Sequence, residues 1–312
     1  MNRFFHLASR GFEILWQLAS DSRYRAFYWQ RRFTHPALRA RFAASAAARI
    51  AKHHPAPHLG SELEQPARQL QEDGIAFLPG LLSGQQLSEI RTYLESKSVR
   101  DPYAKGSAAF YPKAGSTTGG HVAFHESADV LKAPHLLALA NYPALLSLAG
   151  ATLKCMPTIV YLAAWWSFPT NRGPQQAENF HRDYDDWRFL KFFLYLSDVG
   201  PEQGPHVYVR RSVQSEKCRA IRRYVDGEVA VQFSPQDILT LTGAAGTAFI
   251  ENTFGLHKGL PLKQGQRLIF QVVYGINPLP YGPREPIART REISTGTLNF
   301  VDPWINRIYV KT

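Results

Sequence analysis

About eight short strand-like segments between residues 161 and 274 constrain the fold more than any other feature of the chain. Each is rich in aromatic and aliphatic residues and is bounded by glycine, proline or polar turns. They cover residues 161–167, 179–183, 191–197, 206–210, 229–233, 238–242, 247–252 and 268–274. Such a series, joined by short turns, is typical of a double-stranded β-helix, the jelly-roll or cupin-like barrel. The sequence therefore predicts a mainly β protein with flanking helices.

Two helical segments are expected before these strands. Ser83 and Gln86 have the spacing of a capping box, which predicts a helix that begins there and runs through about residue 97. A second helix is expected over residues 129–149. Asn141 and Pro143 interrupt the apolar stretch around it, which falls short of the roughly 20 residues that span a bilayer. We therefore expect core helices here.

The triplet His181-Arg182-Asp183 is a candidate metal site together with His257. In an extended strand, residues two apart project from the same side and can reach one ion. On a helix the same pair would diverge. Two imidazoles and one carboxylate leave half of an octahedral coordination sphere open, as non-haem Fe(II) oxygenases require. The triplet alone would equally fit a hydrogen-bonded pair at a strand edge.

Arg267 opens the strand-like segment that follows His257. A hairpin between the two segments could bring these residues close together. A guanidinium offers a carboxylate two parallel hydrogen bonds, a geometry that lysine cannot supply. Arg267 is therefore a candidate for binding a carboxylate-bearing co-substrate, and the alternative is a structural ion pair, for example with Glu251.

Taken in order, these motifs resemble the phytanoyl-CoA dioxygenase-like family of Fe(II)- and 2-oxoglutarate-dependent oxygenases. The resemblance covers roughly residues 73–276 and rests on several motifs in family order, which is more specific than any one of them. The matching segments are 73–83, His181-Arg182-Asp183, 195–199, 204–209, His257 and Arg267.

The resemblance implies that His181, Asp183 and His257 hold Fe(II) and that Arg267 pairs with the distal carboxylate of 2-oxoglutarate. With O2 as the further co-substrate, the implied reaction is hydroxylation of an unactivated C–H bond. Asp183 favours oxygenation, because related halogenases have a small residue in its place. The chain departs from the family at residues 210–213, where Arg-Arg-Ser-Val stands instead of Pro-Gly-Ser-His. The family's substrates are therefore not transferred.

Alternatives from other classes remain open. A jelly roll can be a non-catalytic ligand-binding module, or a cupin-like metal enzyme that does not use 2-oxoglutarate. The substrate of an oxygenase could be a small molecule, a lipid or a saccharide. The sequence also leaves undecided whether a further group of residues line a pocket or the core; they are Lys191, Trp187, Trp165, Trp166 and Tyr161.

We expect three parts: a basic helical extension and linker over residues 1–65, the oxygenase domain over 66–280, and a tail packed on that domain over 281–312. Residues 1–54 contain ten basic and two acidic residues, a net charge of +8 out of the chain's +11. Basic amphipathic helices with aromatic residues can bind an anionic membrane surface. We favour the alternative, in which their apolar faces pack on the barrel and their arginines are solvated. No nucleic-acid-binding motif is present.

Composition favours a globular protein, since 45% of the 312 residues are hydrophobic and 20% are charged. Cys155 and Cys218 are too few for a disulfide framework and lack the spacing of a zinc site. Arg10 and Glu13 interrupt the first hydrophobic segment, which argues against a secretory signal. We therefore expect a cytoplasmic protein.

Overall fold

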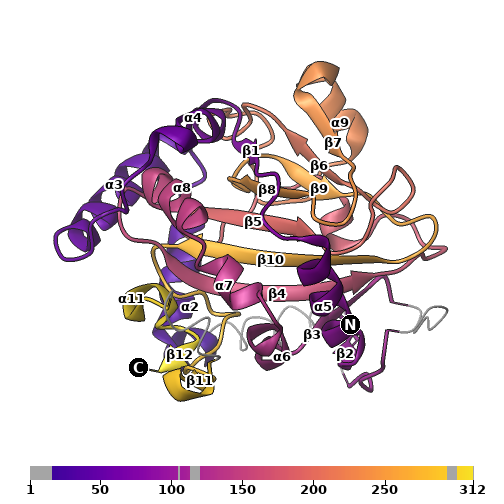
Figure 1. The fold of residues 1–312 in the computed structure, drawn as a ribbon. Helices are drawn as coiled ribbons and strands as arrows, with labels where there is room; N and C mark the ends of the chain where they lie inside the picture. Colours follow the sequence, from indigo (N-terminus) through magenta and orange to yellow (C-terminus); the bar gives the residue numbers. More distant parts are fainter. Residues whose placement is uncertain (1–15, 105, 113–119, 294–300, 312) are drawn as a thin grey trace.

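The computed structural model describes residues 16–104, 106–112, 120–293 and 301–311. Two antiparallel sheets face each other, and helices cover the outer face of the larger sheet (Figure 1). The larger sheet has the order β1 (Ile75–Phe77), β8 (Ala248–Glu251), β5 (Phe189–Tyr195), β10 (Arg267–Gly275), β4 (Thr158–Ser167), β3 (Val122–His125) and β2 (Val99–Arg100). The smaller sheet has the order β7 (Ile238–Leu241), β6 (His206–Val209) and β9 (His257–Gly259). The mainly β architecture with flanking helices is confirmed.

Alternation along the central strands sends side chains to two different cores. On β5, Leu190 and Phe192 face outward and pack with the helices in the largest apolar cluster. Phe193 and Tyr195 face inward, between the two sheets. Every residue of β5 and β10 is buried, which explains why these strands have no polar face in the sequence.

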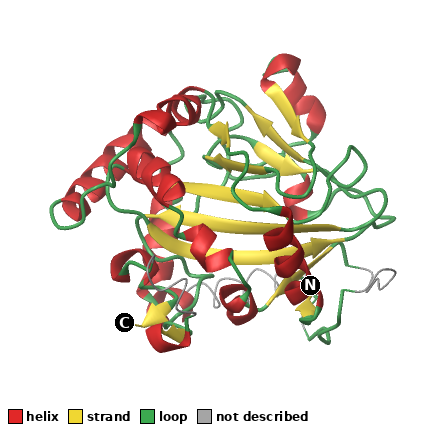
Figure 2. Cartoon of the chain, viewed as in Figure 1, coloured by secondary structure: helices red, strands yellow, loops and turns green. Residues whose placement is uncertain are grey.

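Helices lie along one side of the large sheet and at its ends (Figure 2). Those before β4 are α2 (Ser22–Gln30), α3 (Pro36–Ala51), α4 (Glu64–Glu72), α5 (Gly84–Glu95), α6 (Ser127–Lys132), α7 (Leu136–Ala140) and α8 (Pro143–Leu153). Later elements are α9 (Asp226–Ala230), α11 (Pro303–Asn306) and the parallel pair β11 (Ala288–Arg289) and β12 (Val310–Lys311). Single 3-10 turns lie at η1 (Ser61–Leu63), η2 (Gln176–Glu178), η3 (Pro235–Asp237) and η4 (Thr290–Glu292).

The capping box before α5 is confirmed. The Gln86 amide donates to Ser83 Oγ at 3.2 Å, and the Ser83 amide donates to Gln86 Oε1 at 2.9 Å. The single helix expected over residues 129–149 was wrong, because the segment forms α6, α7 and α8. Asn141 ends α7 and Pro143 begins α8. By length and apolar composition, Leu136–Leu153 would also suit a membrane span, but 67% of it is buried inside this fold, as core helices are.

Six of the expected strands overlap observed ones, and two expectations were wrong. Residues 229 and 230 belong to the short helix α9, and residues 231–233 follow it. The first turn of α9 is fixed by the Val225 amide, which donates to Glu228 Oε2 at 3.0 Å. Residues 179–183 form no regular strand; single bridges join Phe180 to Tyr224 and His181 to His257. The expected hairpin was also wrong, since β9 and β10 belong to different sheets.

The N-terminal helices pack on the barrel. Arg39 of α3, which we expected to be solvated, is only 3% exposed. Its guanidinium donates to Gln30 O at 3.0 Å, to Phe33 O at 3.2 Å and to Asp186 O. A first amphipathic helix is expected from the spacing of apolar residues over 5–19; residues 1–15 lie outside the described residues, and residues 16–20 are helical. At the other end of the chain, the hydroxyl of Tyr309 accepts the Leu162 amide of β4 at 2.7 Å.

Candidate metal centre

His181 and His257 lie side by side because the main chain pairs them. The His181 amide donates to His257 O at 2.9 Å, and the His257 amide donates to His181 O at 3.0 Å. Their ring centroids are 4.3 Å apart. Asp183 Oδ1 lies 3.6 Å from His181 Nε2, and Asp183 Oδ2 lies 3.4 Å from His257 Nε2. One possible ligand atom from each residue therefore falls within a group 4.8 Å across.

Backbone carbonyls fix both imidazoles in the tautomer that a metal requires. His181 Nδ1 lies 2.9 Å from Asn179 O, and His257 Nδ1 lies 3.0 Å from Gly255 O. A carbonyl only accepts, so each Nδ1 carries a hydrogen, which leaves Nε2 as the nitrogen of each ring that can bind a metal once it is deprotonated. Metal-binding histidines are typically oriented in this way. The arrangement suits a divalent cation held by two nitrogens and one carboxylate oxygen.

Lys191 of β5 occupies one side of the carboxylate ligand. Its Nζ lies 2.7 Å from Asp183 Oδ2 and 2.8 Å from Asp185 Oδ2. This ion pair leaves Asp183 Oδ1 as the oxygen free to bind a metal, so the carboxylate would be monodentate. A monodentate Asp183 and two imidazoles would leave three positions of an octahedral ion for other ligands. The side chain of Lys191 therefore faces into the barrel.

The charges of these groups depend on burial and on each other. Burial alone would raise the pKa of Asp183, but Lys191 and His257 outweigh it and hold that pKa well below its ordinary value. Burial lowers the pKa of His181 well below 6.5. For His257, burial lowers the pKa, but Asp183 outweighs it and raises the pKa above 6.5. Asp183 is therefore an anion at neutral pH, and His181 is neutral.

Two further residues hold the ligand segments, and our reading of the sequence missed both. Arg182 faces away from the metal centre, and its guanidinium donates to Phe254 O at 2.6 Å and Cys218 O at 3.0 Å. The Leu256 amide, next to His257, donates to the hydroxyl of Ser212 at 2.7 Å. In an extended segment, an arginine between two ligands faces the side opposite to them, and this was the available signal for Arg182. Ser212 carried no such signal, except that it lies within residues 210–213, where the chain departs from the family that it resembles.

Arg267 lies at the beginning of β10, on the inner face of the large sheet. Its guanidinium donates to Gly204 O and to Ser167 Oγ, the latter at 3.0 Å. It is 7% exposed, its Nε is buried without a hydrogen-bond partner, and no carboxylate of the described residues pairs with it. The alternative partner Glu251 instead lies 2.9 Å from His206 Nε2. Burial raises the pKa of Glu251 to about 8.

Gly259 of β9 places a residue without a side chain next to Arg267. His257 and Gly259 lie on the same face of that strand, about 6–7 Å apart. A Cβ on Gly259 would lie 3.9 Å from the nearest guanidinium nitrogen of Arg267, so any longer side chain would cover the guanidinium. A buried arginine that lacks a carboxylate, beside a residue without a side chain, fits the terminal carboxylate of a small dicarboxylate.

The aromatic residues of undecided role separate into several environments. Trp166 faces the helices and its Nε1 donates to His125 Nε2 at 3.2 Å, whereas Trp165 faces inward and stacks on Phe124. Tyr161 meets the ring of Tyr281 edge-on at 4.9 Å. Trp187 packs against Phe33 and Phe42 of the N-terminal segment, away from the metal ligands.

Solved structures share this fold. HygX from Streptomyces hygroscopicus, with nickel and 2-oxoglutarate bound, is 17% identical and matches 73% of this chain and 91% of its own with a TM-score of 0.50. The epimerase SnoN, in complex with Fe3+, alpha ketoglutarate and nogalamycin RO, is 20% identical, with a TM-score of 0.49 and coverage of 73% and 93%. EctD from S. alaskensis with bound Fe is 16% identical, with a TM-score of 0.49 and coverage of 71% and 83%. No family model and no curated protein sequence matches the chain. The likeness to HygX confirms the jelly-roll fold.

Proposed function

We propose that this protein is an Fe(II)- and 2-oxoglutarate-dependent oxygenase. The observation that carries the proposal is the combination of two features in one barrel. His181, Asp183 and His257 present two oriented imidazole nitrogens and one carboxylate oxygen to a common point. Arg267 offers a buried guanidinium without a carboxylate partner beside Gly259. A metal-binding module would need the first feature alone.

The fold comparison supports the proposal. HygX, which shares the jelly roll, was solved with nickel and 2-oxoglutarate bound. In this chain, His181, Asp183 and His257 would hold the iron, and Arg267 would hold the distal carboxylate of 2-oxoglutarate. With iron bound there, O2 would be the oxidant, and 2-oxoglutarate would supply two of the four electrons that reduce it, the substrate C–H bond supplying the other two.

The side chains of this protein supply position and charge. Lys191 neutralises Asp183 and keeps Oδ2 from the metal, so the positions needed for 2-oxoglutarate and O2 stay open. Asn179 O and Gly255 O hold the imidazoles in register. The apolar inner core of Phe193, Tyr195 and Phe249 lies between the two sheets and lowers the local dielectric, which strengthens these electrostatic contacts. We propose hydroxylation of an unactivated C–H bond in a small-molecule, lipid or saccharide substrate.

The proposal is tested by the turnover of 2-oxoglutarate in the absence of a primary substrate. Iron-loaded protein is incubated with 2-oxoglutarate in air, and succinate is quantified. We expect slow succinate formation by the wild type, none by Asp183→Ala, and a strongly raised 2-oxoglutarate requirement for Arg267→Gln. If wild type and Arg267→Gln respond identically to 2-oxoglutarate, the protein is a metal enzyme of another kind. If the wild type binds no metal, it is a ligand-binding module.

A further inference from the structure

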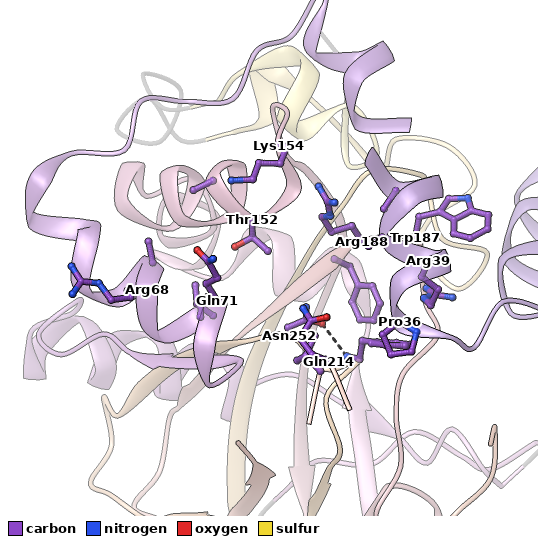
Figure 3. Close-up of a pocket in the computed structure, with 18 of the residues that line it drawn as sticks. Pro36, Arg39, Arg68, Gln71, Thr152, Lys154, Trp187, Arg188, Gln214 and Asn252 are labelled. Carbon is purple, nitrogen blue, oxygen red and sulfur yellow. Dashed lines mark hydrogen bonds between the residues drawn. The ribbon is translucent and has the colours of Figure 1, made fainter. Parts of the chain in front are cut away.

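A second cavity, of about 580 Å3, lies outside the barrel and is separate from the metal centre. It is bounded by α3 and α4, by the end of α8, and by the segments around Arg188, Gln214 and Asn252 (Figure 3). Neither the three metal ligands nor Arg267 lines it. Its volume is in the range of cavities that bind small ligands.

One end of the cavity is basic. Lys154 and Arg188 extend toward one space, with the Thr152 hydroxyl and the Gln71 amide beside them (Figure 3). Arg188 donates one hydrogen bond, to Leu153 O at 3.0 Å. Within the described ranges, the side chain of Lys154 has no hydrogen bond or ion pair, and no carboxylate lies within ion-pair distance of Arg188. These cations therefore differ from Arg39, whose donors are satisfied by carbonyl oxygens.

The charge of the lining is unbalanced. Four basic side chains line the cavity, namely Arg39, Arg68, Lys154 and Arg188, and the single acidic one is Glu64. Even Glu64 lies outside ion-pair distance of any of them. Lys154 and Arg68 are exposed and Arg188 is half-buried, so solvent weakens their mutual repulsion without removing it, and an anion that enters between them is attracted by the excess positive charge.

The other wall is apolar. Ala43 of α3, Leu70 of α4 and Phe189 of β5 line it. A ligand that satisfied both ends would have an anionic group at Lys154 and Arg188 and an apolar body against the helices. An ordinary inorganic anion would use only half of the cavity.

From this arrangement we propose that the cavity is a binding site for a small amphiphilic anion, such as an alkyl phosphate or a long-chain carboxylate. The site is independent of the proposed oxygenase activity, since it uses none of the residues assigned to iron or to 2-oxoglutarate. Because α3 and α4 form one wall, an occupied site would fasten the N-terminal helices to the barrel. The same headgroup chemistry could come from a soluble metabolite or from a membrane lipid.

The test is an isothermal calorimetric titration of the metal-free protein with octyl phosphate, at concentrations below its critical micelle concentration. The double variant Lys154→Asn/Arg188→Gln removes two charges, keeps a residue suited to the left-handed backbone at position 154 (φ 64°), and keeps an amide donor near Leu153 O. The matched control is Arg91→Gln/Lys132→Asn, which removes two charges from α5 and α6, where both side chains are exposed. Circular dichroism checks that both fold.

We expect saturable binding of one octyl phosphate, weakened at least tenfold in the Lys154/Arg188 variant and less than twofold in the control. Inorganic phosphate should bind at least tenfold more weakly than octyl phosphate. Equal weakening in both double variants would overturn the proposal, because net charge alone would then explain binding. Loss of binding in Arg267→Gln would also overturn it, by placing the ligand in the barrel. Binding to anionic phosphatidylglycerol vesicles without binding of monomeric octyl phosphate would assign the charges to a membrane surface and reject the cavity.

Discussion

Replacing Arg39 with methionine tests whether the N-terminal helices and the barrel fold as one unit. The guanidinium is buried and donates to main-chain oxygens of Gln30, Phe33 and Asp186, which belong to both parts. Methionine keeps much of the stem volume but removes the donor from these carbonyls, of which, among the described residues, only Gln30 O retains another, the Phe33 amide at 3.2 Å. Each unsatisfied group costs about 1–3 kcal/mol, and relaxation with entering water limits the total. We expect a loss of about 3–5 kcal/mol in the free energy of unfolding.

Urea denaturation followed by tryptophan fluorescence and by near-ultraviolet circular dichroism measures this loss. The control is Arg41→Met, two residues away on the same helix and exposed. We expect its effect to stay within about 0.5 kcal/mol, as for surface changes away from specific contacts. A loss below about 1 kcal/mol for Arg39→Met, or a separate early transition in the wild type, would refute the reasoning, because the helices would then be a loosely attached extension.

Four further predictions concern the metal centre. The pKa of His257 is raised above 6.5, and only a neutral imidazole binds metal. When the pH is lowered from 8, the Fe(II) affinity measured by anaerobic titration should therefore already decrease before pH 6.5 is reached. Constant affinity between pH 8 and pH 6 would contradict this. Arg267→Gln should raise the dissociation constant of 2-oxoglutarate at least tenfold and leave that of the metal within twofold, which calorimetry of the nickel-loaded protein can check. Gly259→Val should act in the same way by covering the guanidinium, and unchanged 2-oxoglutarate binding would show that the co-substrate lies elsewhere. Ser212→Ala should lower the free energy of unfolding, measured by urea denaturation, by about 1–3 kcal/mol, because it leaves the buried Leu256 amide without a hydrogen-bond acceptor. A change below about 0.5 kcal/mol would argue against a role of Ser212 in holding the His257 segment.

The chain's local patterns were sufficient to predict six of the observed strands and three residues that the structure brings together as possible metal ligands. Strand signals are strong in β5 and β10 because both are buried on each face and rich in aromatic and β-branched residues. His181 and Asp183 share a face even though their segment forms only an isolated bridge, because an extended main chain is enough to align them.

Long-range relationships could not be predicted in the same way. The proximity of His257 and Arg267 arises from two sheets that face each other, and a hairpin was the simplest alternative in a linear sequence. The burial of Arg39 depends in part on one carbonyl oxygen, that of Asp186, which is 147 residues away, whereas its sequence neighbours suggest a solvated basic helix. The direction of the Lys191 side chain likewise depends on its ion pairs with Asp183 and Asp185, which the sequence pattern alone does not reveal. Helix α9 replaced an expected strand because five residues give too few repeats to tell the two periods apart.

The most direct test of the proposed oxygenase is an anaerobic titration of the metal-free protein with Fe(II) and then with 2-oxoglutarate, monitored for the weak visible charge-transfer band of an iron-chelated keto acid. We predict that the band develops with one equivalent of each in the wild type. It should be absent in Asp183→Ala and should require at least tenfold more 2-oxoglutarate in Arg267→Gln. A wild type that binds Fe(II) but gives no band at saturating 2-oxoglutarate would contradict the proposal and leave a metal-binding jelly roll of another function.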